Sequence, residues 1–173
     1  YLFLLKVFKN FNNYSLNIIG DTSRDNDYYI KIKKYVKNNR LSKKIHFIGK
    51  VSDSKLSKLY SQTDFYISAS KYEGFGMSLA NSLIVKKPII TFYTKTIYQT
   101  LNYKGVLYFD QFSVKYLQKL ILENCFNKDN FKKLNESVKK NKRYFLTPNE
   151  SATKFIKILN LSLIHISEPT RRK

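Results

Sequence analysis

The chain has 173 residues, 43% of them hydrophobic and 16% aromatic, so it can bury one core, and wholesale disorder is excluded. Its net charge of +20 would suit nucleic acid or an anionic membrane, but lysine carries most of it alongside abundant Asn, Ile, Tyr and Phe, all residues of A/T-rich codons. Genome composition is therefore the favoured cause, and a basic surface facing a membrane is second. Nucleic acid is least favoured, because no stacking platform or arginine-rich segment accompanies the lysines.

Short apolar runs alternate with amphipathic stretches, which predicts an α/β fold with a parallel sheet covered by helices. In the first half, helices are predicted over residues 1–11, 25–38 and 53–62, with Ser52 as an N-cap of the third. Strands are predicted over residues 16–19, 45–48 and 65–69. The opening of the chain in an apolar segment without a cap leads us to expect truncation at this end.

In the second half, a helix is predicted over residues 77–85, and strands over 88–92 and 106–109. Two further helices follow from apolar faces, one shared by Val114, Leu117, Ile121 and Cys125 and the other by Phe131, Leu134 and Val138. Thr147-Pro-Asn-Glu150 has the signals of one more helix start. We see no internal repeat and no boundary between domains.

Residues 161–171 are set apart from the rest of the chain. They read Leu-Ser-Leu-Ile-His-Ile-Ser-Glu-Pro-Thr-Arg, which resembles the in-frame translation of a transposase-type sequencing-library adapter. We therefore predict one domain over residues 1–160 and an artefactual tail over residues 161–173.

Few single residues indicate a catalytic, redox or metal-binding role. Cys125 is the single cysteine, so no internal disulfide can form, and its apolar neighbours predict a buried residue rather than a nucleophile. His46 lies mid-strand and is predicted to be partly buried and structural. No spacing predicts a metal site, and the apolar runs are too short for a transmembrane helix.

One segment stands out, because Glu73-Gly74-Phe75-Gly76-Met77 joins the strand at 65–69 to the helix at 77–85. Ligands of open α/β sheets bind outside the carboxyl ends of the strands, which is where this junction lies. The glycines would allow a tight turn and close approach, and the N–H groups at the helix start favour a phosphate or sugar hydroxyls. Glu73 adds an acceptor for hydroxyl donors. Taken alone, the pattern also fits an ordinary strand-to-helix turn.

The segment resembles the motif of retaining GT-B glycosyltransferases of family 4 (glycosyl transferases group 1), in which Gly-Phe-Gly follows a Glu and a second Glu lies in the next helix. Blocks of the chain at residues 16–21, 45–51, 52–64, 65–70 and 87–90 resemble the same family in the same order. The resemblance extends over about residues 1–160. It implies the C-terminal half of the GT-B fold, a Rossmann-like parallel sheet with helices on both faces that binds a nucleotide sugar.

The resemblance assigns a role to each matching position. Glu73 would face the donor sugar, and the diphosphate and sugar hydroxyls would be held by the backbone of Gly74, Phe75, Gly76 and Met77. Gly49 and Val51 would lie against the nucleobase, and Gly20 would line the donor cleft.

Asn81 departs from the family pattern. It stands where the family has the second Glu, which grips the ribose hydroxyls. An amide cannot make the charge-assisted bidentate bond of a carboxylate, so either ribose binding is kept in a weaker form, which we favour, or the protein is an inactive relative.

The resemblance also implies parts that this sequence lacks. The family's C-terminal half opens with a strand and an Arg and Lys that neutralise the diphosphate, and an N-terminal half carries the acceptor site. Without that strand, the strands at 16–19 and 65–69 would flank an empty slot in a sheet ordered 3-2-1-4-5-6. We expect the chain to transfer no sugar alone, and to be poorly soluble or to adjust its pairing.

The predicted function is that of a glycosyltransferase fragment, inactive alone, that binds a nucleotide-diphosphate sugar without a metal or other cofactor. The acceptor would be a glycan or a lipid-linked molecule, met in the cytoplasm or at the inner face of the membrane. The alternative is a basic α/β module that docks on nucleic acid or anionic lipid, with binding that depends steeply on salt. A third interpretation is another GT-B member, such as an epimerase or a phosphorylase relative.

Overall fold

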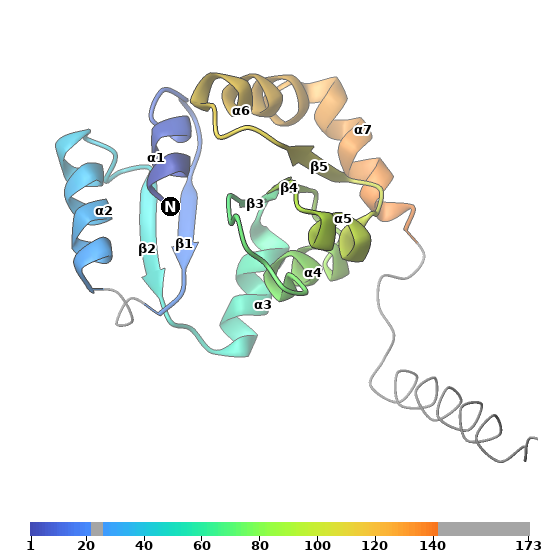
Figure 1. The fold of residues 1–173 in the computed structure, drawn as a ribbon, viewed down its shortest axis with the longest axis horizontal. Coiled ribbons are helices and arrows are strands. Elements are labelled where there is room, and N and C mark those ends of the chain that lie inside the picture. Colours follow the sequence, from blue (N-terminus) through green and yellow to red (C-terminus); the bar gives the residue numbers. More distant parts are fainter. Residues whose placement is uncertain (22–25, 142–173) are drawn as a thin grey trace, which may run out of the picture. The chain divides into compact units, whose positions relative to one another are not determined.

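The computed structural model describes residues 1–21 and 26–141, in which strands and helices alternate (Figure 1). The first elements are α1 (Leu2–Phe8), β1 (Leu16–Ile19), α2 (Asn26–Asn38), β2 (Ile45–Gly49) and α3 (Asp53–Gln62). The next are β3 (Tyr66–Ser68), α4 (Met77–Ile84), β4 (Ile89–Phe92), α5 (Lys95–Leu101) and β5 (Val106–Phe109). Last come α6 (Val114–Ile121), the π-helical turn η1 (Leu122–Phe126) and α7 (Lys128–Lys139).

Side-chain caps fix the starts of several helices. Ser52 accepts the Lys55 N–H at 3.4 Å, which confirms the predicted cap of α3. Thr94 caps α5 in the same way, with the Ile97 N–H at 3.1 Å. The sequence analysis did not predict α5, so this helix is an addition. The predicted helix after Thr147 and the tail at 161–173 lie outside the described residues.

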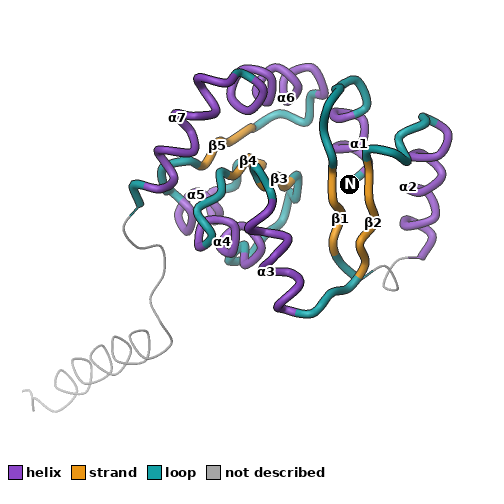
Figure 2. Tube along the Cα trace, turned by 180° about the vertical axis from the view of Figure 1, so that it is seen from behind, coloured by secondary structure: helices purple, strands orange, loops and turns teal. Residues whose placement is uncertain are grey.

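All strand pairs are parallel, as predicted, but they form two separate sheets in the described part of the chain. One sheet pairs β1 with β2, and the other has the order β3-β4-β5, as the trace in Figure 2 shows. No hydrogen bonds join β1 to β3. The two strands that were expected to flank an empty slot therefore belong to different sheets.

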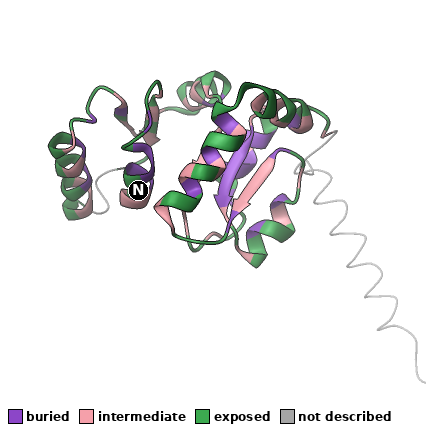
Figure 3. Cartoon of the chain, turned by 90° about the horizontal axis from the view of Figure 1, so that it is seen from above, coloured by how far each residue is buried: buried purple, intermediate pink, exposed green. Residues whose placement is uncertain are grey.

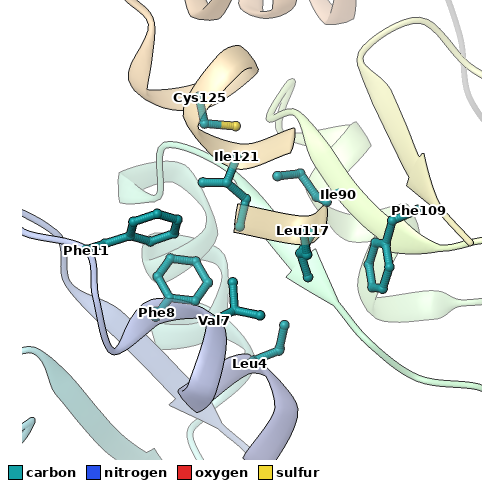
Figure 4. Packing of buried hydrophobic residues seen from close by; sticks show 9 residues of the cluster. All are labelled: Leu4, Val7, Phe8, Phe11, Ile90, Phe109, Leu117, Ile121 and Cys125. Atoms are coloured by element: carbon teal, nitrogen blue, oxygen red, sulfur yellow. The ribbon is translucent and has the colours of Figure 1, made fainter. Parts of the chain in front are cut away.

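Helices bury their inner faces against the strands and expose their outer faces (Figure 3). One core joins α1, β4, β5, α6 and η1 and consists of Leu4, Val7, Phe8, Phe11, Ile90, Phe109, Leu117, Ile121 and Cys125 (Figure 4). A second core lies between α1, α2 and β2 and consists of Leu5, Ile32, Val36, Leu41 and Ile45. Because Leu4 and Leu5 point into different cores, α1 packs against both.

The predictions that Cys125 is buried and that His46 is partly buried have different outcomes. Cys125 is buried, and burial raises the pKa of its thiol to about 12, so it stays protonated and is no nucleophile at neutral pH. The prediction that His46 is partly buried was wrong. His46 is exposed, because Ile45 takes the inward direction on β2 and the next residue of a strand points to the opposite face. No helix of the described residues is long and apolar enough to cross a membrane.

Candidate functional site

The loop between β3 and α4 carries the motif, and short polar contacts hold its beginning. Ser70 donates its hydroxyl to the carbonyl of Tyr72 at 2.9 Å, and the N–H of Ser70 donates to Ser68 Oγ at 3.3 Å. Lys71 lies with its ammonium 4.7 Å from the centre of the Phe112 ring. These contacts fix the path of the chain from β3 towards Glu73.

Gly76 is the residue on which the turn into α4 depends. It is buried, adopts left-handed backbone angles (φ 75°, ψ 48°) and is the N-cap residue of α4. A Cβ at this position would lie 2.9 Å from Ile97 Cδ1 and 3.3 Å from Leu79 Cδ1. Gly74, in contrast, is exposed and has no atom within 4 Å of such a Cβ. The open space above Gly74 therefore leaves the backbone accessible to a ligand.

The start of α4 offers N–H groups that no side chain of the N-cap residue occupies. Gly76 makes no side-chain cap, and the first intrahelical bond runs from the Ala80 N–H to the Gly76 carbonyl at 2.9 Å. The N–H groups of the first turn precede that bond and have no intrahelical partner. Such a helix start carries partial positive charge and suits an anion.

A polar cluster near this helix start consists of Tyr60, Tyr66 and Ser78. Tyr60 donates its hydroxyl to the Ser78 carbonyl at 2.9 Å, and its ring stacks on that of Tyr66. Burial raises the pKa of Tyr66, a hydrogen bond with Ser78 opposes the rise, and electrostatic interactions with Tyr1 and then Glu73 add to it. Glu73 itself is half-buried.

The side chains of the other motif residues turn outward. Phe75 is 47% exposed and Met77 is 64% exposed. Asn81 is half-buried on the second turn of α4. It lies on the same element as Met77, one turn further along the helix.

A cavity of about 890 Å³ lies between β1 and β3 and brings some of the predicted residues together. Gly20 and Val51 line it, and so do Lys50 and Ser78, which were not singled out from the sequence. The N–H of Gly20 donates to the Gly49 carbonyl at 3.2 Å, so Gly49 is adjacent although it does not line the cavity. The segment from Glu73 to Met77 and Asn81 also lie outside its lining.

Other contributors could not be found from the motif. Tyr60 and Tyr66 face each other only because α3 packs beside β3, and Ile97 and Leu101 lie under Gly76 only because α5 forms. The Thr94 cap followed by Ile97 was the one local signal of that helix. Among residues 1–21 and 26–141, no group of three His, Cys, Asp or Glu residues could hold a metal ion.

Comparison with known proteins identifies one family. The model of the family described as "Glycosyl transferases group 1" matches residues 2–145. A curated relative, the mannosylfructose-phosphate synthase of Agrobacterium fabrum (strain C58 / ATCC 33970), is 28% identical over 83 residues, which are 47% of this chain and 18% of that protein.

Solved structures show the same fold. A glycosyltransferase from Rickettsia africae ESF-5 has a TM-score of 0.72 at 23% identity, over 91% of this chain and 42% of that one. The C-terminal domain of a glycosyl transferase group 1 family protein (LpcC) from Francisella tularensis has a TM-score of 0.67 at 21% identity, over 79% of this chain and 73% of that one.

A third solved structure contains a nucleotide. Anabaena Alr3699/HepE in complex with UDP has a TM-score of 0.69 at 13% identity, over 79% of this chain and 38% of that one. This chain therefore spans less than half the length of the curated relative, the Rickettsia protein and the Anabaena protein.

Proposed function

Because the chain belongs to the glycosyl transferases group 1 family, we propose that its residues 1–160 form the donor-binding domain of a glycosyltransferase that takes a nucleotide-diphosphate sugar at the carboxyl end of β3. The fold is that of the C-terminal GT-B domain, with parallel strands that alternate with helices. In such sheets ligands bind beyond the carboxyl ends of the strands.

The observation that carries the proposal is the helix start of α4 beside a carboxylate. The N–H groups that follow Gly76 would hold the diphosphate, because they combine free donors with the positive end of the helix dipole. Glu73 would accept hydrogen bonds from hydroxyls of the donor sugar. The open space at Gly74 would allow the sugar to approach the backbone there without a side-chain obstacle.

The nucleoside would extend from this helix start towards β1 and β2. Gly20, Gly49 and Val51 are grouped at the carboxyl ends of these two strands, where Gly20 and Val51 line the cavity. Asn81 would bond the ribose hydroxyls from the second turn of α4. The UDP bound by Anabaena Alr3699/HepE makes a uridine nucleotide the first ligand to test.

Transfer of the sugar requires a second surface that faces the donor site and holds the acceptor. Transfer depends on an acceptor held against the donor in a closed cleft, so the 173-residue chain should bind the donor and transfer nothing by itself. The acceptor would be a glycan or a lipid-linked molecule, handled in the cytoplasm or at the inner face of the membrane. We expect the donor to bind without a metal ion or another cofactor.

Calorimetric titration of the chain with UDP and with UDP-glucose tests the proposal. We expect saturable binding of both, and Gly76→Val should weaken both because it displaces the helix start. Glu73→Gln should weaken UDP-glucose by about tenfold and leave UDP unchanged, since a charge-assisted hydrogen bond contributes about 1.5–3 kcal/mol. The matched control, Glu136→Gln on the exposed face of α7, should change neither.

Three results would count against the proposal. The first is no saturable binding of either nucleotide by the folded chain. The second is an equal loss of UDP and UDP-glucose binding in Glu73→Gln, which would remove Glu73 from the sugar. The third is salt-sensitive binding to anionic vesicles or nucleic acid without a preference for nucleotide sugars, which would favour the basic binding module instead.

A further inference from the structure

Different elements hold the two ends of the loop between β3 and α4, which consists of residues 69–76. At its end, Gly76 lies against α5, because a Cβ there would be 2.9 Å from a side chain of that helix. At its beginning, the Lys71 ammonium lies 4.7 Å from the centre of the Phe112 ring, which belongs to the loop between β5 and α6. Glu73 lies between these two anchor points, so the position of its carboxylate depends on both.

Packing and a helix cap fix the position of Phe112. Ser113, the next residue, accepts the Tyr116 N–H at 3.3 Å and caps α6. The Phe112 ring also packs against three other rings, with centroids 5.0, 4.5 and 6.1 Å away, which are those of Phe3, Phe92 and Phe109 respectively. Two of these rings come from the last residues of β4 and β5. Phe112 is therefore anchored at the carboxyl edge of the three-stranded sheet, the edge at which the loop after β3 also starts.

Part of the Phe112 side chain remains accessible, and there it meets Lys71. Phe112 is 37% exposed, so the ammonium can lie over the ring and stay in contact with water. An aromatic face attracts such a cation through its negative quadrupole, and an aliphatic side chain of similar size does not. The contact with Lys71 therefore requires the ring of Phe112 and not only its hydrophobic volume.

The backbone links the position of Lys71 to that of Glu73. The Ser70 hydroxyl donates to the Tyr72 carbonyl at 2.9 Å, and the Ser70 N–H donates to Ser68 Oγ at 3.3 Å. The first of these bonds closes a short turn around Lys71, and Glu73 is the residue that follows Tyr72. Loss of the contact at Lys71 would therefore release this turn and, with it, the segment that carries Glu73.

We propose that Phe112 is a positioning residue of the donor site, which holds Glu73 against the donor sugar by binding Lys71 on its ring. This inference rests on the proposed function, in which Glu73 accepts hydrogen bonds from the sugar and the start of α4 holds the diphosphate. The helix start is supported by α5, whereas the segment before Glu73 is supported by Phe112. Loss of the Phe112 ring should therefore affect binding of the sugar and spare binding of the diphosphate.

Calorimetric titration of the full 173-residue chain with UDP and with UDP-glucose tests this difference. Phe112→Leu keeps an apolar side chain and removes the ring. It should weaken UDP-glucose by about threefold, the scale of a cation–π contact at an exposed site, and leave UDP unchanged. Phe112→Tyr keeps the ring and should keep the affinity for both. The matched control is Phe126→Leu in η1, which changes a phenylalanine that is 38% exposed and should alter neither affinity.

Variants of Lys71 test the other partner of the contact. Lys71→Met should reproduce the threefold loss of UDP-glucose affinity, and its combination with Phe112→Leu should bind no more weakly than either single variant. Lys71→Arg keeps a cation over the ring and should keep the affinity. Lys33→Met is the matched control, because it removes a similar contact, 5.2 Å from the centre of the Tyr29 ring on α2, and it should change neither ligand.

A measurement without nucleotide separates this inference from the proposed function. Amide order parameters of residues 71–75, measured by nitrogen relaxation in the free chain, should fall from about 0.85 towards about 0.6 in Phe112→Leu and in Lys71→Met, and should stay unchanged in Phe126→Leu. If the native chain bound neither UDP nor UDP-glucose, the proposed function would fail. The order parameters would then decide alone whether Phe112 positions the loop.

Three outcomes would overturn the role of Phe112. The first is unchanged UDP-glucose binding in a folded Phe112→Leu variant. The second is an equal loss of UDP and UDP-glucose in Lys71→Met, which would make the ammonium a direct partner of the diphosphate. The third is unchanged order parameters in both variants. Circular dichroism before titration checks folding, and Lys71→Met, at an exposed position, keeps the test decisive if Phe112→Leu does not fold.

Discussion

At the scale of single residues, Gly74 and Gly76 of the motif are in different surroundings, so each would require glycine for a different reason. Gly76 has left-handed backbone angles and no room for a side chain, whereas Gly74 has open space above it. A requirement for glycine at position 76 therefore arises from the fold itself. The requirement at position 74 would arise from a ligand.

Gly76→Ala should lower the free energy of unfolding by about 1–3 kcal/mol, from left-handed strain and contact with Ile97. Gly74→Ala should change it by less than about 0.5 kcal/mol. Urea denaturation followed by circular dichroism measures both. An equal loss in the two variants would show that the turn is held in another way.

Asn81 gives a second prediction at this scale. Asn81→Glu should tighten UDP binding by about fivefold, because a carboxylate makes stronger bonds to ribose hydroxyls than an amide does. Asn38→Glu, at the exposed end of α2, adds the same charge elsewhere and should have no effect in the same calorimetric titration. Unchanged or weaker UDP binding in Asn81→Glu would argue against a ribose contact.

At the scale of elements, the strands were the most predictable part of the molecule. Each predicted strand is present, and α3 has the predicted bounds, because the apolar runs and the Ser52 cap are local signals. Phe65 and Ala69 were assigned to β3 but lie just outside it, since an edge strand without its second neighbour has fewer bonds to define its ends. The α5 helix was missed because only Ile97 and Leu101 of its seven residues are buried.

The candidate site was predictable in its location but not in its construction. The Gly-Phe-Gly segment was placed correctly between β3 and α4. The support from α5 under Gly76 and the Tyr60–Tyr66 pair both depend on tertiary packing. Contacts between distant segments have no period or spacing by which a single sequence could show them.

The Thr94 cap is the feature that sets the stability of α5. Thr94→Ala should destabilise the chain by about 0.5–2 kcal/mol, because it removes the cap of α5, the helix that supports Gly76. Thr96→Ala, at an exposed position in the same helix, should be close to neutral or slightly stabilising. Thermal unfolding of the two variants distinguishes the loss of the capping hydrogen bond from the general effect of replacing a threonine in this helix.

At the scale of the whole described unit, the cavity between β1 and β3 and the candidate donor site share a border. Gly20 and Ser78 line the carboxyl end of the cavity, and Ser78 belongs to the first turn of α4, which is proposed to hold the diphosphate.

The position of α1 has a consequence for how the molecule opens. Leu4 and Phe8 pack into the core of the three-stranded sheet, Leu5 packs into the core of α2 and β2, and the Gln118 side chain donates to the Val7 carbonyl at 2.8 Å. One seven-residue helix thus holds the small sheet against the large one. Amide hydrogens of β1 and β2 should exchange with deuterium together, at a rate set by the detachment of α1, while those of β4 remain protected until global unfolding.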